Sequence, residues 1–314
     1  MSSTMNIVET HELTKIYATR LKKGNVVALD RVTLHVEQGE VFGLLGPNGA
    51  GKTTMVKTLL SITTISSGEA LINGLSPSNP TSREKVGFLP ESHRFPSHLT
   101  GMELLHFAGR LSGMSTVQIS QRTDMLLKLV GMEKWGGMKL RKYSKGMSQR
   151  IGLAQALVAG PDIVFLDEPT DGIDPVGKME IRQVLKRLRS EGKTIFLNSH
   201  LLSEVEAVAD RVAILLRGRV VRTGTIEELT VKDSQYEIEA DIGNKTIDIP
   251  EEMGRRISLT SKGMTVALNN SEDINSIIDK LRMQRISIRS VKPLKQTLEQ
   301  SFFEAVSDST EPEA

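Results

Sequence analysis

The sequence predicts an α/β protein whose larger part is built on a parallel sheet, with a smaller α+β domain behind it. Three apolar runs each end in polar residues and lead into a helical pattern, as parallel strands do; they span 41–45, 163–166 and 194–197. From about residue 231 the pattern changes to short alternating strands and amphipathic helices. We therefore expect a large domain over 6–230, a small one over 231–306 and a disordered tail over 307–314.

The composition excludes several classes of function. The chain is 39% hydrophobic and 25% charged, which is typical of a soluble globular protein. A net charge of +2 and only eight Phe, three Tyr and one Trp argue against a nucleic-acid-binding surface. The absence of cysteine excludes disulfides and thiol chemistry, and it fits a reducing compartment. Neither a signal peptide nor an apolar run of about 18 residues is present, so we expect any membrane-spanning part to belong to another chain.

The first 45 residues predict strands that form an antiparallel subdomain ahead of the parallel core. The expected strands cover residues 7–10, 13–17, 26–36 and 41–45. Tyr17 ends the second of these strands, just before a basic turn. Two interpretations stay open at this point, because a tyrosine here could stack on a purine ring or could simply be half-buried in the strand.

A glycine-rich turn follows the strand 41–45 and precedes a helix expected from Thr54 to about Ile62. The turn and the helix start comprise Gly46, Pro47, Asn48, Gly49, Ala50, Gly51, Lys52, Thr53 and Thr54. The glycines let backbone N–H groups converge on anionic oxygens, and the helix dipole at Gly51 adds to their attraction. We expect Lys52 to reach the β- and γ-phosphates and the Thr53 hydroxyl to ligate Mg²⁺. A turn that carries a lysine by chance is the alternative, and the flanking strand and helix argue against it.

The middle of the chain predicts a helical insert in the α/β domain, over about 95–147. It follows a short strand at 86–90 and a polar loop that begins at Glu91. Thr100 and Glu103 have the spacing of a capping box, and two helical patterns come after them.

Ser144 and Gly146 come near the end of this insert, just ahead of a helix expected over 149–159. Such a helix start is fit to hold an anion, and an ordinary serine cap is the alternative.

Acidic and polar residues end the next two buried strands. Asp167 and Glu168 follow the strand 163–166, at the edge of the sheet where ligands bind in α/β proteins. Adjacent carboxylates repel one another, so we expect Asp167 to hold Mg²⁺ and Glu168 to orient an attacking water. The alternative is a solvated strand end. His200 ends the strand that begins at Thr194, and it could donate to a γ-phosphate or be structural.

The remaining elements complete the large domain and form the small one. A hairpin over 212–222 and a short helix over 226–229 close the large domain. The small domain is expected to contain strands at 236–241, 245–249, 257–259, 264–268 and 286–291, with helices at 271–281 and 294–306. Its residues show no catalytic constellation.

Residues 6–230 resemble, in order, the ATP-binding subunit of an ABC transporter. The matching segments are the Walker A loop at 46–53, the signature motif at 143–147, Walker B with its catalytic glutamate at 164–168, the D-loop at 171–174, the switch histidine His200 and the adenine-stacking aromatic Tyr17. The resemblance implies a homodimer, or a paired ATPase subunit, arranged head to tail. Each ATP would lie between the P-loop of one subunit and Ser144 and Gly146 of the other, with Asp174 of the D-loop at the same site.

Three features depart from the pattern of that family: the signature motif, the Q-loop residue and a residue after Walker B. The usual Leu-Ser-Gly-Gly-Gln reads Tyr-Ser-Lys-Gly-Met, so that Lys145 adds a positive charge near the phosphate. Glu91 replaces the Q-loop glutamine and could itself ligate Mg²⁺ or water, and Asp171 adds a third acid after Walker B. These forms and the extra carboxyl-terminal domain are similar to the branch that serves multidrug, antibiotic and sodium exporters.

The function expected from this resemblance is ATP hydrolysis coupled to transport. ATP and Mg²⁺ bind, Glu168 activates water, and Lys52, His200 and the partner's Ser144 stabilise the charge that develops. The helical insert and the Glu91 loop drive a separate transmembrane permease, so the chain would lie peripherally at the cytoplasmic face of the membrane.

The sequence is less consistent with two other functions of an ATP-binding protein. A soluble ABC ATPase acting on ribosomes or nucleic acid usually carries two ATPase domains or a long coiled coil, and this chain has one P-loop and no basic stripe. A nucleotide-binding regulator without hydrolysis would not need both Asp167 and Glu168. The resemblance favours export, and import is the alternative that nothing in the residues themselves decides against. The residues also identify no transported substrate.

Overall fold

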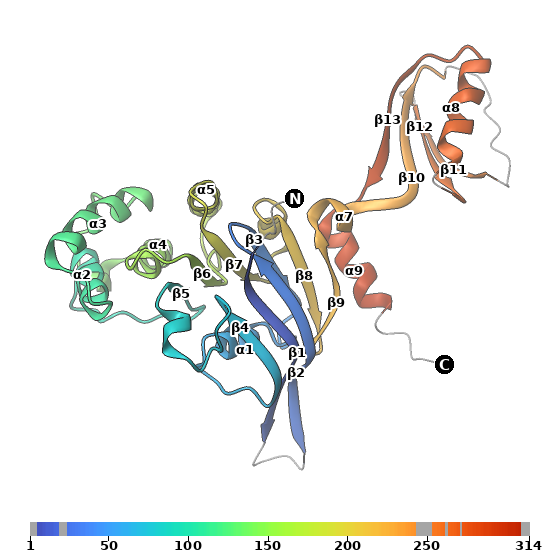
Figure 1. The fold of residues 1–314 in the computed structure, drawn as a ribbon. Coiled ribbons are helices and arrows are strands. Elements are labelled where there is room, and N and C mark those ends of the chain that lie inside the picture. Colours follow the sequence, from blue (N-terminus) through green and yellow to red (C-terminus); the bar gives the residue numbers. More distant parts are fainter. Residues whose placement is uncertain (1–4, 19–23, 243–252, 261–262, 271, 309–314) are drawn as a thin grey trace. The chain divides into compact units, whose positions relative to one another are not determined.

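The computed structural model describes residues 5–18, 24–242, 253–260, 263–270 and 272–308 (Figure 1). The chain forms two compact units, one from residues up to Ile226 together with those from Ala305 onward, and one from Glu227 to Glu304. The larger unit combines an antiparallel sheet, a mainly parallel sheet and a group of helices, which confirms the predicted α/β fold class. Within the described ranges no helix is both long enough and apolar enough to span a bilayer.

The antiparallel sheet holds the amino-terminal strands in the order β2-β1-β4. Its strands are β1 (Asn6–Ala18), β2 (Asn25–Glu37) and β4 (Ser67–Ile72). The prediction of two separate strands at 7–10 and 13–17 is wrong, because both segments belong to β1. The pairing with β2 shifts register between Thr10 and Leu13, and Glu12 has a φ of 46°. A bulge of this kind bends a strand without ending it.

The second sheet has the order β5-β6-β7-β3-β8-β9, parallel except for β9 at one edge. Its strands are β3 (Val41–Leu45), β5 (Val86–Leu89), β6 (Ile163–Asp167), β7 (Thr194–Ser199), β8 (Arg211–Leu216) and β9 (Arg219–Thr225). Phe196 lies at the centre of the sheet, with ring centroids 5.5 Å from Phe42 and 5.1 Å from Phe165. Every residue of β3, β6 and β7 is buried, as the continuous apolar runs predict.

The register of the three central strands brings their polar ends together. Leu45 pairs with Ser199, and Asp167 pairs with Asn198, so the loop after β3 and the ends of β6 and β7 share one edge of the sheet. The helices that follow these strands are α1 (Lys52–Leu59), α5 (Pro175–Ser190) and α6 (Leu202–Glu206). Helix α1 starts two residues earlier and ends three residues earlier than expected, since Leu60 is its C-cap and Ser61 adopts a φ of 57°.

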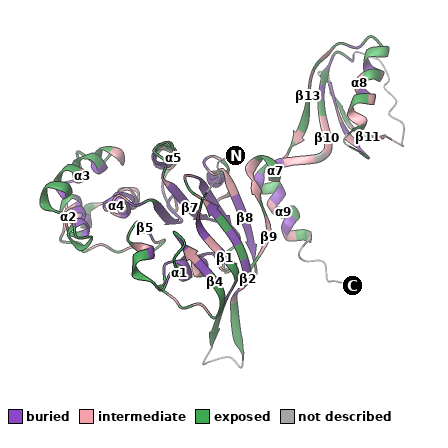
Figure 2. Ribbon diagram, viewed as in Figure 1, coloured by how far each residue is buried: buried purple, intermediate pink, exposed green. Residues whose placement is uncertain are grey.

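The helices α2 (Gly101–Leu111) and α3 (Thr116–Leu129) fall within the expected helical insert over about 95–147, and α4 (Lys145–Leu157) begins at its end. The three helices lie together at one end of the larger unit (Figure 1). Short 3-10 turns occur at Pro80–Arg83 and Leu140–Lys142. The predicted capping box is present, since Thr100 and Glu103 exchange hydrogen bonds of 3.1 and 2.7 Å. Figure 2 shows much of the surface of α2 and α3 as exposed.

The start of α4 corrects the prediction for this helix. We expected it at Gln149, with Ser144 and Gly146 ahead of it, yet the helix begins at Lys145. The Ser144 hydroxyl accepts a hydrogen bond of 3.2 Å from the backbone N–H of Met147, so Ser144 is the N-cap. Gly146 therefore lies in the first turn of α4.

The smaller unit contains an antiparallel sheet of order β11-β12-β10-β13 and the helix α8. Its elements are β10 (Val231–Ala240), β11 (Gly254–Thr260), β12 (Gly263–Leu268), α8 (Asp273–Met283) and β13 (Ile288–Lys295). In the chain, α7 (Ile226–Thr230) precedes β10 and α9 (Leu298–Asp308) follows β13. Ile238, Val266 and Leu281 belong to its apolar core.

Three expectations for the carboxyl-terminal residues need correction or fall outside the description. The last helix starts at Leu298 rather than Leu294, because β13 continues to Lys295 and Thr297 exchanges capping hydrogen bonds with Gln300. Ser307 and Asp308, expected in a disordered tail, belong to α9. The expected strand 245–249 and residues 309–314 lie outside the described residues.

Candidate active site

The loop between β3 and α1 forms an open backbone cradle. Gly51 is the N-cap of α1 with a φ of 111°, and no side chain caps the first turn. A Cβ at Gly51 would collide with the backbone oxygen of Ala28, so the close approach of the two segments requires glycine. The N–H groups at the start of α1 are therefore available to an anion.

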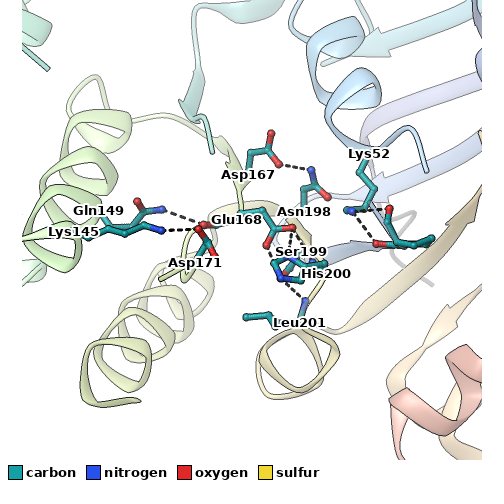
Figure 3. Close-up of polar contacts among 12 residues, drawn as sticks. Lys52, Lys145, Gln149, Asp167, Glu168, Asp171, Asn198, Ser199, His200 and Leu201 are labelled. Carbon is teal, nitrogen blue, oxygen red and sulfur yellow. Dashed lines mark hydrogen bonds and ion pairs between the residues drawn. The ribbon is translucent and has the colours of Figure 1, made fainter. Parts of the chain in front are cut away.

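Lys52 is the buried cation of this loop, with only 7% of its surface exposed. Its Nζ donates to the backbone oxygens of Gly46 at 2.8 Å and Pro47 at 3.3 Å (Figure 3). Burial lowers the pKa of Lys52, and the charges of Glu168, Asp167 and Glu91 oppose that effect. Those two oxygens hold the ammonium group against the loop between β3 and α1.

Asp167 ends β6 as a buried carboxylate, with 2% of its surface exposed. It accepts a hydrogen bond from Nδ2 of Asn198 on the neighbouring strand. Burial raises the pKa of Asp167 to about 6, the charge of Glu91 adds to the increase, and a hydrogen bond from the Thr53 side chain opposes it. An anion in so dry a position needs a cation to offset it.

Glu168 follows Asp167 and is held at a φ of 52°, which is unusual for a residue with a side chain. Its Oε1 accepts from the backbone N–H of His200 at 2.9 Å and lies 2.8 Å from His200 Nδ1. Ser199 Oγ donates to Oε2 at 3.3 Å, and the Glu168 backbone N–H donates to the oxygen of Asn198 at 2.9 Å. Figure 3 shows Glu168 and His200 directed toward each other, so the carboxylate and the imidazole form one hydrogen-bonded unit.

A cleft of about 600 Å³ joins the cradle to these residues. Its lining residues are Val26, Val27, Ala28, Asn48, Gly49, Gly51, Lys52, Thr53, Thr54, Glu91, Glu168, Asp171, Asn198 and His200. Most of the predicted phosphate, metal and catalytic residues thus meet in one space. Sequence reasoning did not identify Val26, Val27 and Ala28, which β2 contributes to the wall. The sequence offered one indication of their role: the strand 26–36 begins shortly after the strand that ends at Tyr17, so the two would pair with Val26 near Tyr17.

Eight of the predicted site residues are not among those that line this cleft. Gly46, Pro47, Ala50 and Asp167 belong to the neighbouring loop and strand end, whereas Tyr17, Ser144, Gly146 and Asp174 lie on other elements. Tyr17 pairs with Val26 in the sheet, is 36% exposed, and has Lys15 Nζ 4.9 Å from its ring centroid. Ser144 and Gly146 lie at the start of α4. Asp174 caps α5 by accepting from the backbone N–H of Gly177 at 3.0 Å, a contact that lowers its pKa.

The oxygen-rich donor set suits magnesium held jointly with a phosphate. No group of three His, Asp or Glu side chains in the described ranges could enclose a metal ion alone. Thr53 and Asp167 supply a hydroxyl and a carboxylate, and Glu91 supplies a second carboxylate at the cleft. Mg²⁺ commonly takes one or two carboxylates and completes its shell with water and substrate oxygens. The residues therefore fit a magnesium–triphosphate complex.

Comparisons with known proteins point to one family. A family model described as ABC transporter matches residues 29–171. The chain is 38% identical over 301 residues to an uncharacterized ABC transporter ATP-binding protein of Synechocystis, covering 95% of this chain and 84% of that protein. It is 34% identical to the Nod factor export ATP-binding protein I of Cupriavidus metallidurans, covering 77% and 76%.

A solved structure agrees with these sequence matches. The dimeric, post-hydrolysis ATP-binding cassette MJ0796, bound to ADP and Pi, matches with a TM-score of 0.64 and 26% identity. The match covers 69% of this chain and 98% of that one.

Proposed function

Because this chain belongs to the family of ABC transporter ATP-binding proteins, we propose that it hydrolyses ATP with residues on both sides of the cleft described above. One observation carries the proposal: the cradle with Lys52 and the Glu168–His200 unit line the same cleft at one edge of the sheet. Phosphoryl transfer depends mainly on positioning and on electrostatic stabilisation, and this arrangement supplies both.

The cradle residues bind the triphosphate. The backbone N–H groups of Gly46 and of residues 48–54 surround the phosphates, and Lys52 moves its donated hydrogen bonds from backbone oxygens to phosphate oxygens. Thr53, Asp167 and Glu91 would hold Mg²⁺, and the ion would offset the negative charge of the triphosphate. The bound cation would offset the charge of the buried Asp167 carboxylate.

Glu168 is the proposed base for the attacking water. The backbone N–H of His200 and the Ser199 hydroxyl fix its carboxylate, so that it can orient water and accept its proton. The His200 imidazole lines the cleft beside it and stabilises the charge that develops on the γ-phosphate. Tyr17 stacks on the adenine from the strand next to Val26.

A second set of residues contributes to the nucleotide site of the partner subunit; these are Ser144, Gly146 and Asp174. They lie outside the cleft of their own chain, as residues that complete a second nucleotide site would. The dimeric cassette with ADP and Pi supports such an assembly. Each ATP is then enclosed by the cradle of one subunit and the α4 start of the other.

The proposed physiological role is export through a separate transmembrane permease, with the chain peripheral at the cytoplasmic face of the membrane. The export protein among the relatives supports the direction of transport. Met102, Phe107 and Leu111 are 40%, 52% and 74% exposed on α2, and they give the helical insert an apolar surface for a partner. In this scheme residues 6–230 form the ATPase domain and 231–306 an accessory domain. The relatives reported above do not support the alternative of a ribosome or nucleic-acid ATPase.

The test of this proposal is Glu168→Gln, assayed for both binding and turnover of Mg²⁺–ATP. Glutamine keeps the shape but cannot accept a proton, so turnover should fall by at least about 10²-fold while nucleotide still binds. The control is Glu191→Gln, which alters only an exposed ion pair with Arg187. Turnover near that of the wild type in Glu168→Gln would show that another group is the base.

The permease is tested by gentle-detergent capture of the chain from its native cell. Recovery of a polytopic membrane protein that stimulates hydrolysis supports the transporter role. Recovery of ribosomes or nucleic acid in its place would contradict it.

A further inference from the structure

Two residues that depart from the family pattern contact each other. Lys145 Nζ lies 2.7 Å from Asp171 Oδ2, across 26 residues of sequence (Figure 3). Lys145 is the first residue of α4, beside the cap Ser144, and Asp171 lines the nucleotide cleft. The ion pair therefore joins the α4 start, which would serve the partner's nucleotide, to the subunit's own cleft.

The backbone makes room for this lysine. Gly172 has a φ of 63°, and a Cβ at this position would collide with the end of the Lys145 side chain. The Lys145 side chain thus packs against the backbone at Gly172, and Asp171, the residue before this glycine, accepts its hydrogen bond. The same contact lowers the pKa of Asp171, with smaller help from the charges of His200 and Lys178.

The ion pair between Lys145 and Asp171 is weak enough for a triphosphate to replace Asp171 as the partner of Lys145. The side chains of Lys145 and Asp171 are 58% and 49% exposed, and exposed ion pairs contribute little to stability. A cation in the first turn of a helix also opposes the helix dipole, so Lys145 does not serve α4 itself. A triphosphate, with several negative charges, attracts a flexible ammonium group more strongly than one solvated carboxylate does.

We propose that Lys145 binds the phosphates of the ATP that lies on the partner subunit's cradle. Asp171 binds Lys145 until the two subunits close. In the single subunit Lys145 is bound to Asp171; in the dimer it leaves Asp171 and donates to the triphosphate on the partner's cradle. This inference rests on the proposed function, because it requires the ATP-bound dimer.

The exchange gives the two partners of one ion pair opposite effects on dimerisation. Removing Lys145 removes the new phosphate contact, so the dimer weakens. Removing the charge of Asp171 frees Lys145 in advance, so the dimer strengthens. A latch that merely stabilised the fold would be weakened by both changes in the same direction.

The experiment measures the dimer dissociation constant by sedimentation equilibrium in saturating Mg²⁺–ATP, with Glu168→Gln as the parent to prevent hydrolysis. Lys145→Gln should raise the constant by about tenfold or more, the range of a lost charged hydrogen bond at each site. Asp171→Asn should lower it by up to about fivefold per site, the range of an exposed ion pair. Lys145→Arg keeps the charge and should remain close to the parent.

The double variant Lys145→Gln with Asp171→Asn separates the exchange from general charge effects. It should match Lys145→Gln alone, because the gain from Asp171→Asn requires the lysine. Equal weakening by both single variants, or a gain from Asp171→Asn that persists in the double variant, would overturn the proposal. Urea unfolding of each variant verifies that it folds. If the parent itself forms no ATP-dependent dimer, the proposed function fails and this inference fails with it.

Discussion

Replacing Asp167 with asparagine should stabilise the metal-free and nucleotide-free protein. Burial raises the pKa of Asp167 from 3.8 to about 6. Each pKa unit corresponds to about 1.4 kcal/mol, so ionised Asp167 lowers the free energy of unfolding by about 3 kcal/mol above pH 6. Below pH 3.8 the carboxyl group is neutral in both states and the penalty disappears. Stability of the wild type therefore falls as the pH rises through this window.

The assay is urea unfolding in EDTA, followed by the fluorescence of Trp135. This is the one tryptophan of the sequence, and it belongs to the same unit as Asp167. Asp167→Asn should gain about 3 kcal/mol over the wild type at pH 8 and about 1.5 kcal/mol at pH 5, where the penalty is partial. The control Asp162→Asn removes an exposed carboxylate at the other end of β6, paired with Lys193 at 3.4 Å, and should change stability by less than about 1 kcal/mol.

Two results would refute this reasoning. One is that Asp167→Asn is less stable than the wild type at pH 8 in EDTA. The other is a gain that does not shrink at pH 5. Either would mean that the hydrogen bonds from Asn198 and Thr53 outweigh the cost of burying the charge. With Mg²⁺–ATP the order should reverse, because ligand binding stabilises only a protein that can hold the metal.

Three further predictions address the cradle, the proposed adenine contact and the helical insert. Lys52→Ala should raise the dissociation constant for ATP by at least about tenfold, measured by equilibrium binding, since a charged hydrogen bond to phosphate is lost; an unchanged constant would contradict its role. Tyr17→Ala should raise the same constant by about tenfold through loss of stacking and leave GTP and ATP equally affected, whereas no change would show that Tyr17 is only a strand residue. Thr100→Ala breaks the capping box and should cost about 1 kcal/mol in urea unfolding; Ser115→Ala, at the α3 box, is the matched comparison.

The elements that follow from local patterns could be predicted from the sequence. The buried strands β3, β6 and β7 were visible as apolar runs, and Thr100 with Glu103 marked the start of α2. The start of α4 could not be fixed, because a serine cap can stand at several positions in a polar segment. The continuity of β1 through Glu12 depends on pairing with β2, which is a contact between distant residues.

The same distinction explains the site. The residues proposed to bind phosphate and metal and to catalyse hydrolysis stand at strand ends, where a parallel sheet gathers them, and their positions follow from the order of elements. The cleft wall formed by Val26 and Val27 could not be predicted, because valine is common in strands and carries no group that indicates a binding site. The contact between Lys145 and Asp171 arises only when α4 packs against the turn after β6, so the two charges looked independent in the sequence.

Glu168 combines a strained backbone conformation with the proposed role of catalytic base. Its φ of 52° is one that glycine adopts with little strain, yet a glutamate stands there. Gln149 Nε2 from α4 donates to its backbone oxygen at 3.2 Å, and the neighbouring strand binds its backbone N–H and its carboxylate. These contacts hold the strained residue from two sides, and they connect the proposed base directly to α4, the helix whose start is proposed to serve the partner subunit. A small displacement of α4 on dimer closure would therefore reach the Glu168 carboxylate through a single side chain.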